Sequence, residues 1–182
     1  MATNLTGSFW LSETIQIPAG TASGGRVQGT FDLGAYIDVG DSQAVAIEEY
    51  NVILQVDADY GAAFQNMVAG DASIGTQLSE LNPGTLFVRA DNNNLIASSS
   101  VSIDSSANMA TLVADIFPDT FGKDEESRIV INDTLYGVVG VDGAASAAAR
   151  IVYVTLRIKC RIIKMTKQSW MTKAIEAFGA DN

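Results

Sequence analysis

Polar and apolar residues alternate along the segment Arg150–Met165, near the C-terminus. One set of alternate positions is apolar: Val152, Val154, Leu156, Ile158, Cys160 and Ile162. The positions between them include Thr155, Arg157, Lys159 and Arg161. A period of two is typical of a half-buried β-strand. At roughly 3.3 Å per residue this strand would span about 50 Å, so the pattern predicts a strand that crosses a whole sheet or projects beyond it.

Shorter alternating runs recur along the rest of the chain, with Gly, Asn, Asp and Ser between them. This arrangement is typical of an all-β protein. The predicted strands, about nine in number, are Phe9–Ile17, Val27–Val39, Ala44–Val56, Thr85–Ala90, Leu95–Ile103, Ala107–Asp115, Arg128–Ile131, Leu135–Val141 and Ala149–Met165. The segment Gly61–Leu81 fits either a strand or a helical turn. Eight or nine antiparallel strands with uneven loops favour an antiparallel β-sandwich of the jelly-roll type.

The residues after the long strand predict a short amphipathic α-helix. Thr166 or Ser169 can cap its start, and Gly179 supplies a stop. Apolar residues recur at helical spacing between them: Trp170, Met171, Ala174, Ile175 and Phe178. A helix of this length is marginal in isolation, so its apolar stripe needs a docking surface. That surface is either its own sandwich or another subunit.

The 182 residues fit a single domain. We expect residues 1–25 to form an N-terminal arm or a first strand, residues 26–165 to form the sandwich, and residues 166–179 to form the helix. The first residues have neither the basic region nor the apolar region of a signal peptide, and no run of eighteen apolar residues occurs. We therefore expect synthesis without export and no membrane-spanning helix.

Charge is distributed unevenly along the chain, whose net charge is −10. Residues 1–149 hold 19 acids and 4 bases, a balance of −15, whereas residues 150–182 hold 7 bases and 2 acids, a balance of +5. The basic residues of the long strand have three interpretations. They face acids of their own sheet, such as Glu48 or Glu49; they face an acidic surface of a neighbouring subunit; or they meet lipid head groups or nucleic acid.

The chain lacks most side chains on which enzymes rely. It contains no histidine and a single cysteine, which excludes triads that need His and thiolate zinc sites. No phosphate-binding glycine loop matches a known pattern. Asp57 and Asp59 begin like a calcium loop that lacks its closing Glu. We therefore expect no catalytic residue, no metal and no cofactor, and we expect Cys160 to be buried and inert.

The loop from Asp115 to Arg128 combines two phenylalanines, Phe117 and Phe121, with a cluster of charges. A solvated loop seldom exposes two such side chains together. We expect at least one of them to pack on the body of the protein or on a neighbouring subunit.

The layout of the chain resembles the single jelly-roll capsid proteins of tailless icosahedral viruses, notably the small capsid subunits of membrane-containing archaeal and bacterial viruses. The resemblance lies in the acidic, histidine-free β body and in the segments Asp32–Asp38, Ala44–Gln55 and Arg150–Met165. It implies a capsid subunit that self-assembles into an icosahedral shell, with a second capsid protein as a further partner. It also implies synthesis in the host cytoplasm, residence in the virion, contact of the basic C-terminal segment with an internal membrane or the genome, and no small-molecule substrate.

The alternative function is a non-catalytic β-sandwich module that binds carbohydrate or a surface protein. Such a module needs an exposed aromatic platform, for which the chain offers Trp10, Tyr36, Tyr50, Tyr60 and Tyr153. For the capsid function, the candidate assembly residues are Arg157, Lys159, Arg161, Phe117, Phe121, Trp170, Met171 and Phe178.

Overall fold

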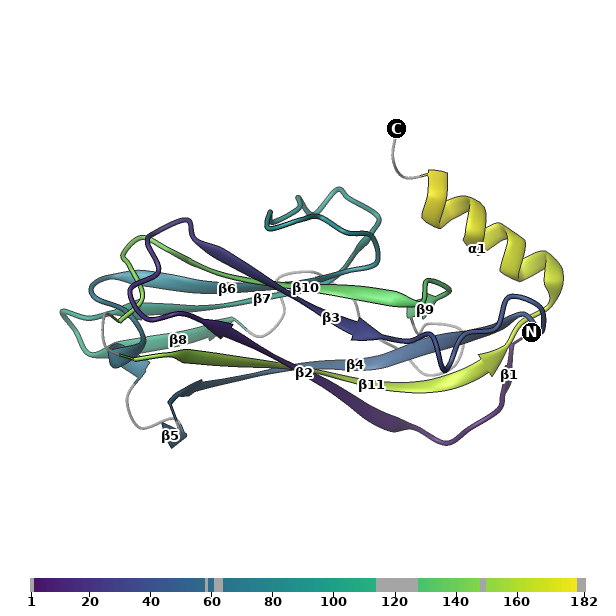
Figure 1. The fold of residues 1–182 in the computed structure, drawn as a ribbon, viewed down its shortest axis with the longest axis horizontal. Helices are drawn as coiled ribbons and strands as arrows, with labels where there is room; N and C mark the ends of the chain where they lie inside the picture. The colour runs from purple at the N-terminus through teal and green to yellow at the C-terminus, as the bar shows by residue number, and fades with distance from the viewer. Residues whose placement is uncertain (1, 58, 61–63, 114–127, 148–149, 180–182) are drawn as a thin grey trace.

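The computed structural model describes residues 2–57, 59–60, 64–113, 128–147 and 150–179, which form two stacked antiparallel sheets and a helix (Figure 1). Sheet A contains β1 (Thr3–Asn4), β2 (Phe9–Ile17), β4 (Gln43–Val56), β5 (Asp59–Tyr60), β9 (Arg128–Val130) and β11 (Val152–Lys164). Sheet B contains β3 (Arg26–Asp32), β6 (Ala72–Ser79), β7 (Leu95–Asp104), β8 (Met109–Val113) and β10 (Thr134–Asp142). The 3₁₀ helix η1 (Phe64–Met67) precedes β6, and α1 (Lys167–Gly179) follows β11.

The strand pairing is that of a long hairpin folded over on itself. Antiparallel pairs form between β2 and β11, β3 and β10, β4 and β9, and β6 and β7, so strands pair from the two ends of the chain inward. Two further pairs, β4 with β11 and β6 with β10, join these into the orders β2-β11-β4-β9 and β3-β10-β6-β7. This order is that of a jelly roll, which confirms the predicted fold class.

The core lies between the two sheets and takes one face of each central strand. In β11 the predicted apolar positions from Val152 to Cys160 are fully buried. Two glycines paired in register, Gly29 and Gly137, lie opposite Ile15 and Leu156 of the other sheet. A Cβ at Gly137 would come within 2.5 Å of Leu156 Cδ1, so the missing side chain lets the sheets approach closely here.

The burial pattern of β11 changes after Cys160, opposite a β-bulge in β4. Lys159 pairs with Glu49 and Cys160 with Ile47, which leaves Glu48 as the extra residue. Beyond the bulge Arg161 and Ile163 are buried whereas Ile162 is half-buried. The predicted division of β11 into one buried and one open face is therefore wrong after Cys160, because α1 and its hydrophobic cluster cover this end.

The predicted strand Thr85–Ala90 is not a strand. It belongs to the segment 81–94, which lies over the outer face of sheet B (Figure 1). Phe87 packs against Gly75, and the Gln77 side chain bonds both the N–H and the carbonyl of Val88. A side chain therefore takes the hydrogen bonds that a neighbouring strand would supply.

Other boundaries differ from the sequence predictions in smaller ways. The strand expected over Val27–Val39 ends at Asp32, whose carboxylate accepts a hydrogen bond from the N–H of Gly34 and starts a turn. The ambiguous segment Gly61–Leu81 contains η1 and β6. Phe117 and Phe121 lie outside the described residues.

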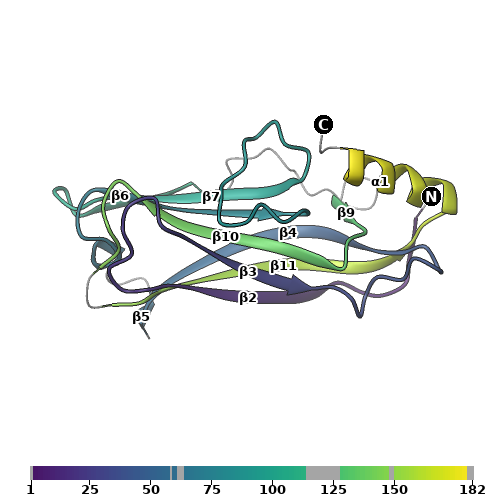
Figure 2. The ribbon, with the colours of Figure 1, turned by 45° about the horizontal axis from the view of Figure 1, so that its top comes forward.

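Helix α1 has the predicted start and end. The Ser169 N–H donates to Thr166 Oγ1 at 3.2 Å, which caps the first turn. Its inner residues pack on a second hydrophobic cluster, separate from the core, which comprises Ala44, Ala46, Ile131, Ile163, Met165 and Ala177, with Ile129, Trp170 and Ala174 at its margin. The helix thus docks on its own sandwich, at the end where β1 and β9 lie (Figures 1 and 2). No helix in the described part of the chain is long and apolar enough to span a bilayer.

Candidate functional site

The outward-facing side chains of β2, β11 and β4 form the outer A face, which is the side of sheet A away from sheet B. It comprises Trp10, Ser12, Thr14 and Gln16 of β2, Tyr153, Thr155, Arg157 and Lys159 of β11, and Glu49, Asn51, Ile53 and Gln55 of β4. The β2 residues are exposed, and the β11 residues are half-buried. Because β11 is central, its two bases occupy the middle of the face.

Arg157 and Lys159 lie beside an exposed tryptophan. The Arg157 guanidinium carbon is 4.6 Å from the centre of the Trp10 ring, within the range of a cation–π contact. Trp10 keeps 40% of its surface exposed. Lys159 lies between Trp10 and Glu49 in register, and Glu49 Oε1 also accepts a hydrogen bond from Asn51 Nδ2 at 2.9 Å.

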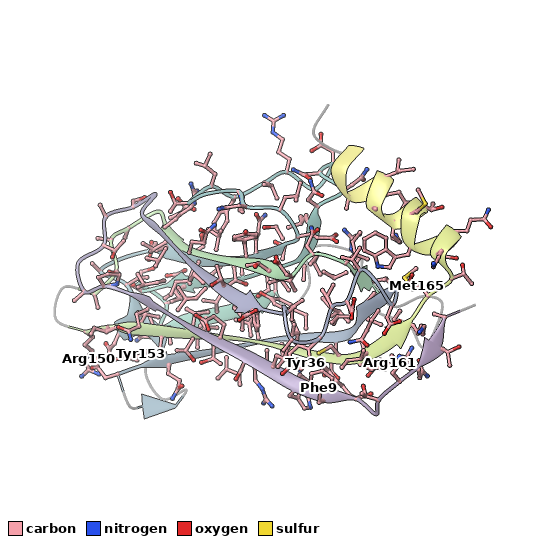
Figure 3. The ribbon with its side chains drawn as sticks, turned by 45° about the vertical axis from the view of Figure 1, so that its right-hand side comes forward. Phe9, Tyr36, Arg150, Tyr153, Arg161 and Met165 are labelled. Carbon is pink, nitrogen blue, oxygen red and sulfur yellow. The ribbon has the colours of Figure 1, made fainter. Side chains whose placement is uncertain are left out.

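Arg161 lies on the same side of β11, beyond Lys159, but it is largely buried. Its Nη1 lies 3.0 Å from Glu48 Oε1, and the Ser8 hydroxyl donates to Glu48 Oε2 at 2.7 Å. Both side chains of the ion pair are largely buried. Of the three interpretations of the basic residues, the contact with an acid of the same sheet is correct for Arg161. This ion pair fastens β11 to the bulge of β4. Figure 3 shows Arg161 near Met165, at the end of β11 from which α1 follows.

Cys160 is fully buried beneath this pair, as predicted. Burial, with a smaller contribution from the charge of Glu48, raises the pKa of its thiol to about 12. The thiol therefore stays protonated at neutral pH and has little nucleophilic character.

A second exposed surface lies on α1. Met171 and Ile175 are one turn apart and keep 63% and 70% of their surface exposed. Their neighbour Trp170 packs inward on the second cluster, so of these predicted contact residues Met171 faces solvent and Trp170 does not. The side chain of Phe178 lies outside the described residues.

A polar cleft of about 350 Å³ separates α1 from β9 and the segment 81–94. Glu80 lies in it, 3.4 Å from Arg128 Nη2, and is almost fully buried. Burial raises the pKa of Glu80, and the Arg128 charge opposes that rise. Sequence reasoning missed this pair because Glu80 follows the mixed polar and apolar segment 72–79 and precedes a turn, a position that is usually solvated.

The remaining aromatic candidates divide between the core and the surface. Tyr36 lies 5.3 Å from Phe9, centre to centre, and the Tyr50 hydroxyl lies 3.2 Å from Thr76 Oγ1, so both serve packing within the sandwich (Figure 3). The side chain of Tyr60 lies outside the described residues. Trp10 and Tyr153 share the outer A face. Within the described residues no group of three or more acids or thiols is placed to hold a metal ion.

No protein-family model matches the sequence, and no curated protein matches it either. Solved structures do match it, and the three described next are structures of plant viruses. A structure of Desmodium yellow mottle tymovirus is 9% identical, with a TM-score of 0.36 over 87% of this chain and 89% of that one. A structure of turnip yellow mosaic virus is 10% identical, with a TM-score of 0.33 over 90% and 86%. A structure of tomato aspermy virus is 11% identical, with a TM-score of 0.29 over 82% and 76%.

Proposed function

We propose that this chain is a non-enzymatic capsid subunit that assembles with copies of itself into an icosahedral shell. The observation that carries the proposal is the jelly-roll order of its strands, established by its own hydrogen-bonded pairs. Jelly rolls occur in capsid proteins, lectins and cupins. Among these, the exposed apolar pair Met171 and Ile175 and the Trp10–Arg157 contact favour a protein that associates with others.

The narrower parts of the proposal rest on the sequence resemblance. They are membership of the membrane-containing archaeal and bacterial viruses, a second capsid protein as partner, synthesis in the host cytoplasm followed by residence in the virion, and contact with an internal membrane or the genome. The positive balance of residues 150–182 supports an anionic partner for the C-terminal segment. Arg161 is poorly accessible to such a contact, because its side chain is largely buried beside Glu48.

Assembly of the purified full-length chain tests the proposal. Light scattering and negative-stain electron microscopy over a range of concentration and salt are expected to show closed shells or curved sheets. A chain that stays monomeric under all these conditions, alone and mixed with a co-encoded second capsid protein, would contradict the proposed function.

A carbohydrate-binding module is the second candidate, because Trp10 is exposed on a sheet face that also carries Ser12, Thr14 and Gln16. An aromatic ring among hydroxyl and amide groups suits a sugar ring. Retention of a monomeric chain on a glycan column, lost in Trp10→Ala, would favour this function over the capsid subunit.

A further inference from the structure

The two sheets of the sandwich are covered differently on their outer sides. Segment 81–94 covers sheet B: Arg26 lies 4.5 Å from the centre of the Phe87 ring, and Gln28 Nε2 donates to the Gly84 carbonyl at 2.6 Å. On the outward side of sheet A, α1 covers the end formed by Ala44, Ala46 and Ile163. In the described part of the chain no segment packs on the residues of the outer A face as segment 81–94 packs on sheet B (Figures 1 and 2). The outer A face is thus the broad sheet surface that the described chain leaves open.

The centre of the outer A face has the composition of an interface core. Tryptophan, tyrosine and arginine are the residues that carry most of the binding energy in protein contacts. Trp10 and Arg157 are in contact, and Tyr153 lies on the same strand face as Arg157. The stacking also holds the Arg157 side chain in place, so less conformational entropy is lost when a partner binds.

The charge of the outer A face identifies a partner. It carries Arg157 and Lys159 against one acid, Glu49, in a chain whose first 149 residues have a balance of −15. Exposed acids lie elsewhere on the molecule, among them Asp32 and Asp133. A second copy of this chain therefore presents the complementary charge.

We propose that the outer A face is one side of a heterologous subunit contact, in which Trp10, Arg157 and Lys159 receive an acidic surface of a second copy. This inference rests on the proposed capsid function. A two-fold contact of the face with itself would bring the basic side chains of both copies together, which is unfavourable. Head-to-tail contacts between different surfaces generate closed rings when the rotation closes, as a shell requires.

Charge reversal at Arg157, with a matched control, tests the contact. Arg157→Glu is compared with Arg89→Glu, an equal charge change at an exposed residue of the segment that covers sheet B. The concentration at which light scattering detects assembly is expected to rise at least roughly tenfold for Arg157→Glu, equivalent to about 1.4 kcal/mol, and to change little for Arg89→Glu. Trp10→Ser, which leaves the charge unchanged, is expected to act in the same direction.

Folding and salt provide the further readouts. Circular dichroism and thermal melting of both variants are expected to stay close to those of the wild type, because Arg89 is exposed and Arg157 is half-buried on an open sheet face. Salt is expected to weaken wild-type assembly and to affect Arg157→Glu less. Unchanged assembly of Arg157→Glu would overturn the contact and leave the capsid function standing if the wild type still forms shells.

A different occupant of the outer A face would give a different result. Single-stranded oligonucleotide and anionic phospholipid vesicles are offered to the wild type and to Arg157→Glu. Loss of binding to either probe in the variant, with assembly unchanged, would overturn the proposal and assign the face to that ligand. Loss of assembly with no binding to either probe is the expected result.

Discussion

At the scale of single residues, Arg161 and Glu48 show how a bulge sets the role of a side chain. Both lie where β4 gains one residue, and their ion pair is 11% and 17% exposed. Removing one charge of a largely buried pair costs more than removing one at the surface. We expect Glu48→Gln to lower the free energy of unfolding by about 3 kcal/mol, measured by urea denaturation.

Asp41→Asn is the matched control for Glu48→Gln. It neutralises the acid in the pair between Asp41 and Lys164, whose side chains are 71% and 51% exposed. Its effect is expected to stay within about 0.5 kcal/mol. Equal effects of the two substitutions would show that burial does not increase the contribution of Glu48 to the free energy of unfolding.

The Cys160 thiol makes a pH-dependent contribution to stability with a definite sign. Its pKa is raised from 9.0 to about 12 in the folded chain, so folding favours the protonated thiol. The contribution is complete below pH 9.0 and is lost as the pH rises toward 12. We expect a thiol reagent at pH 8 to label the unfolded chain rapidly and the native chain hardly at all. Fast labelling of the native chain would contradict the burial of Cys160.

Contacts between single residues of distant segments were the hardest feature to predict from the sequence. Burial of Cys160 followed from the period of β11, because a local pattern determines which side of a strand a residue takes. The pattern offered Glu48 or Glu49 as partners of the basic residues without deciding between this and two other interpretations, and it gave no partner for Glu80. A bulge in β4 and the approach of β9 bring these pairs together from distant segments. No pattern within one strand contains that information.

At the scale of elements, Gly137 controls the distance between the two sheets. Gly137→Ala would place its Cβ 2.5 Å from Leu156 Cδ1 and 3.1 Å from Ile15 Cδ1. Overpacking of this kind costs roughly 1–3 kcal/mol, which chemical denaturation would detect. Gly7→Ala is the control, because no atom lies within 4 Å of its Cβ, and it is expected to have little effect.

Adjacent residues of α1 allow the docking of the helix to be tested. Trp170 packs on the second cluster, whereas Met171 is 63% exposed. We expect Trp170→Ala to reduce the free energy of unfolding by about 2 kcal/mol and Met171→Ala by less than about 0.5 kcal/mol. Near-equal losses in urea unfolding followed by circular dichroism would mean that the helix is not held by its inner face.

Element positions were predictable where a strand or helix carries its own period. The observed β2 has the predicted bounds Phe9–Ile17, and α1 ends at the predicted Gly179. The prediction of a strand over 85–90 was wrong. Leu86 and Val88 alternate as in a strand, but the Gln77 side chain of sheet B supplies the hydrogen bonds to Val88 that a neighbouring strand would make. Tertiary contacts, absent from a local pattern, determined its form.

At the scale of the whole molecule, the jelly-roll order was predictable as a class and not as a specific set of pairs. Strand number and turn spacing favoured a sandwich, but nothing local indicates that β2 pairs with β11 or β3 with β10. The asymmetry between a covered sheet B and the outer A face depends on segment 81–94, of which the sequence pattern placed Thr85–Ala90 in a strand. The contact between Trp10 and Arg157 therefore became visible only once the structure had placed β2 beside β11.

The position of β11 predicts the behaviour of shortened chains. β11 lies between β2 and β4 and pairs with both. A chain ending at residue 149 is expected to lose the centre of sheet A and to show no cooperative thermal transition. A chain ending at residue 166 is the control, since it keeps β11 and is expected to melt cooperatively at a lower temperature. A cooperative transition in the shorter chain would show that sheet A forms without β11.

The same pairing determines when sheet A can form during synthesis. Phe9 pairs in the sheet with Cys160, which the ribosome adds much later. The native pairing of β2 must wait until β11 has been made, because the strand that it needs does not yet exist. The outer A face is therefore completed only after β11 has emerged from the ribosome, so nascent chains cannot join through this surface before that point.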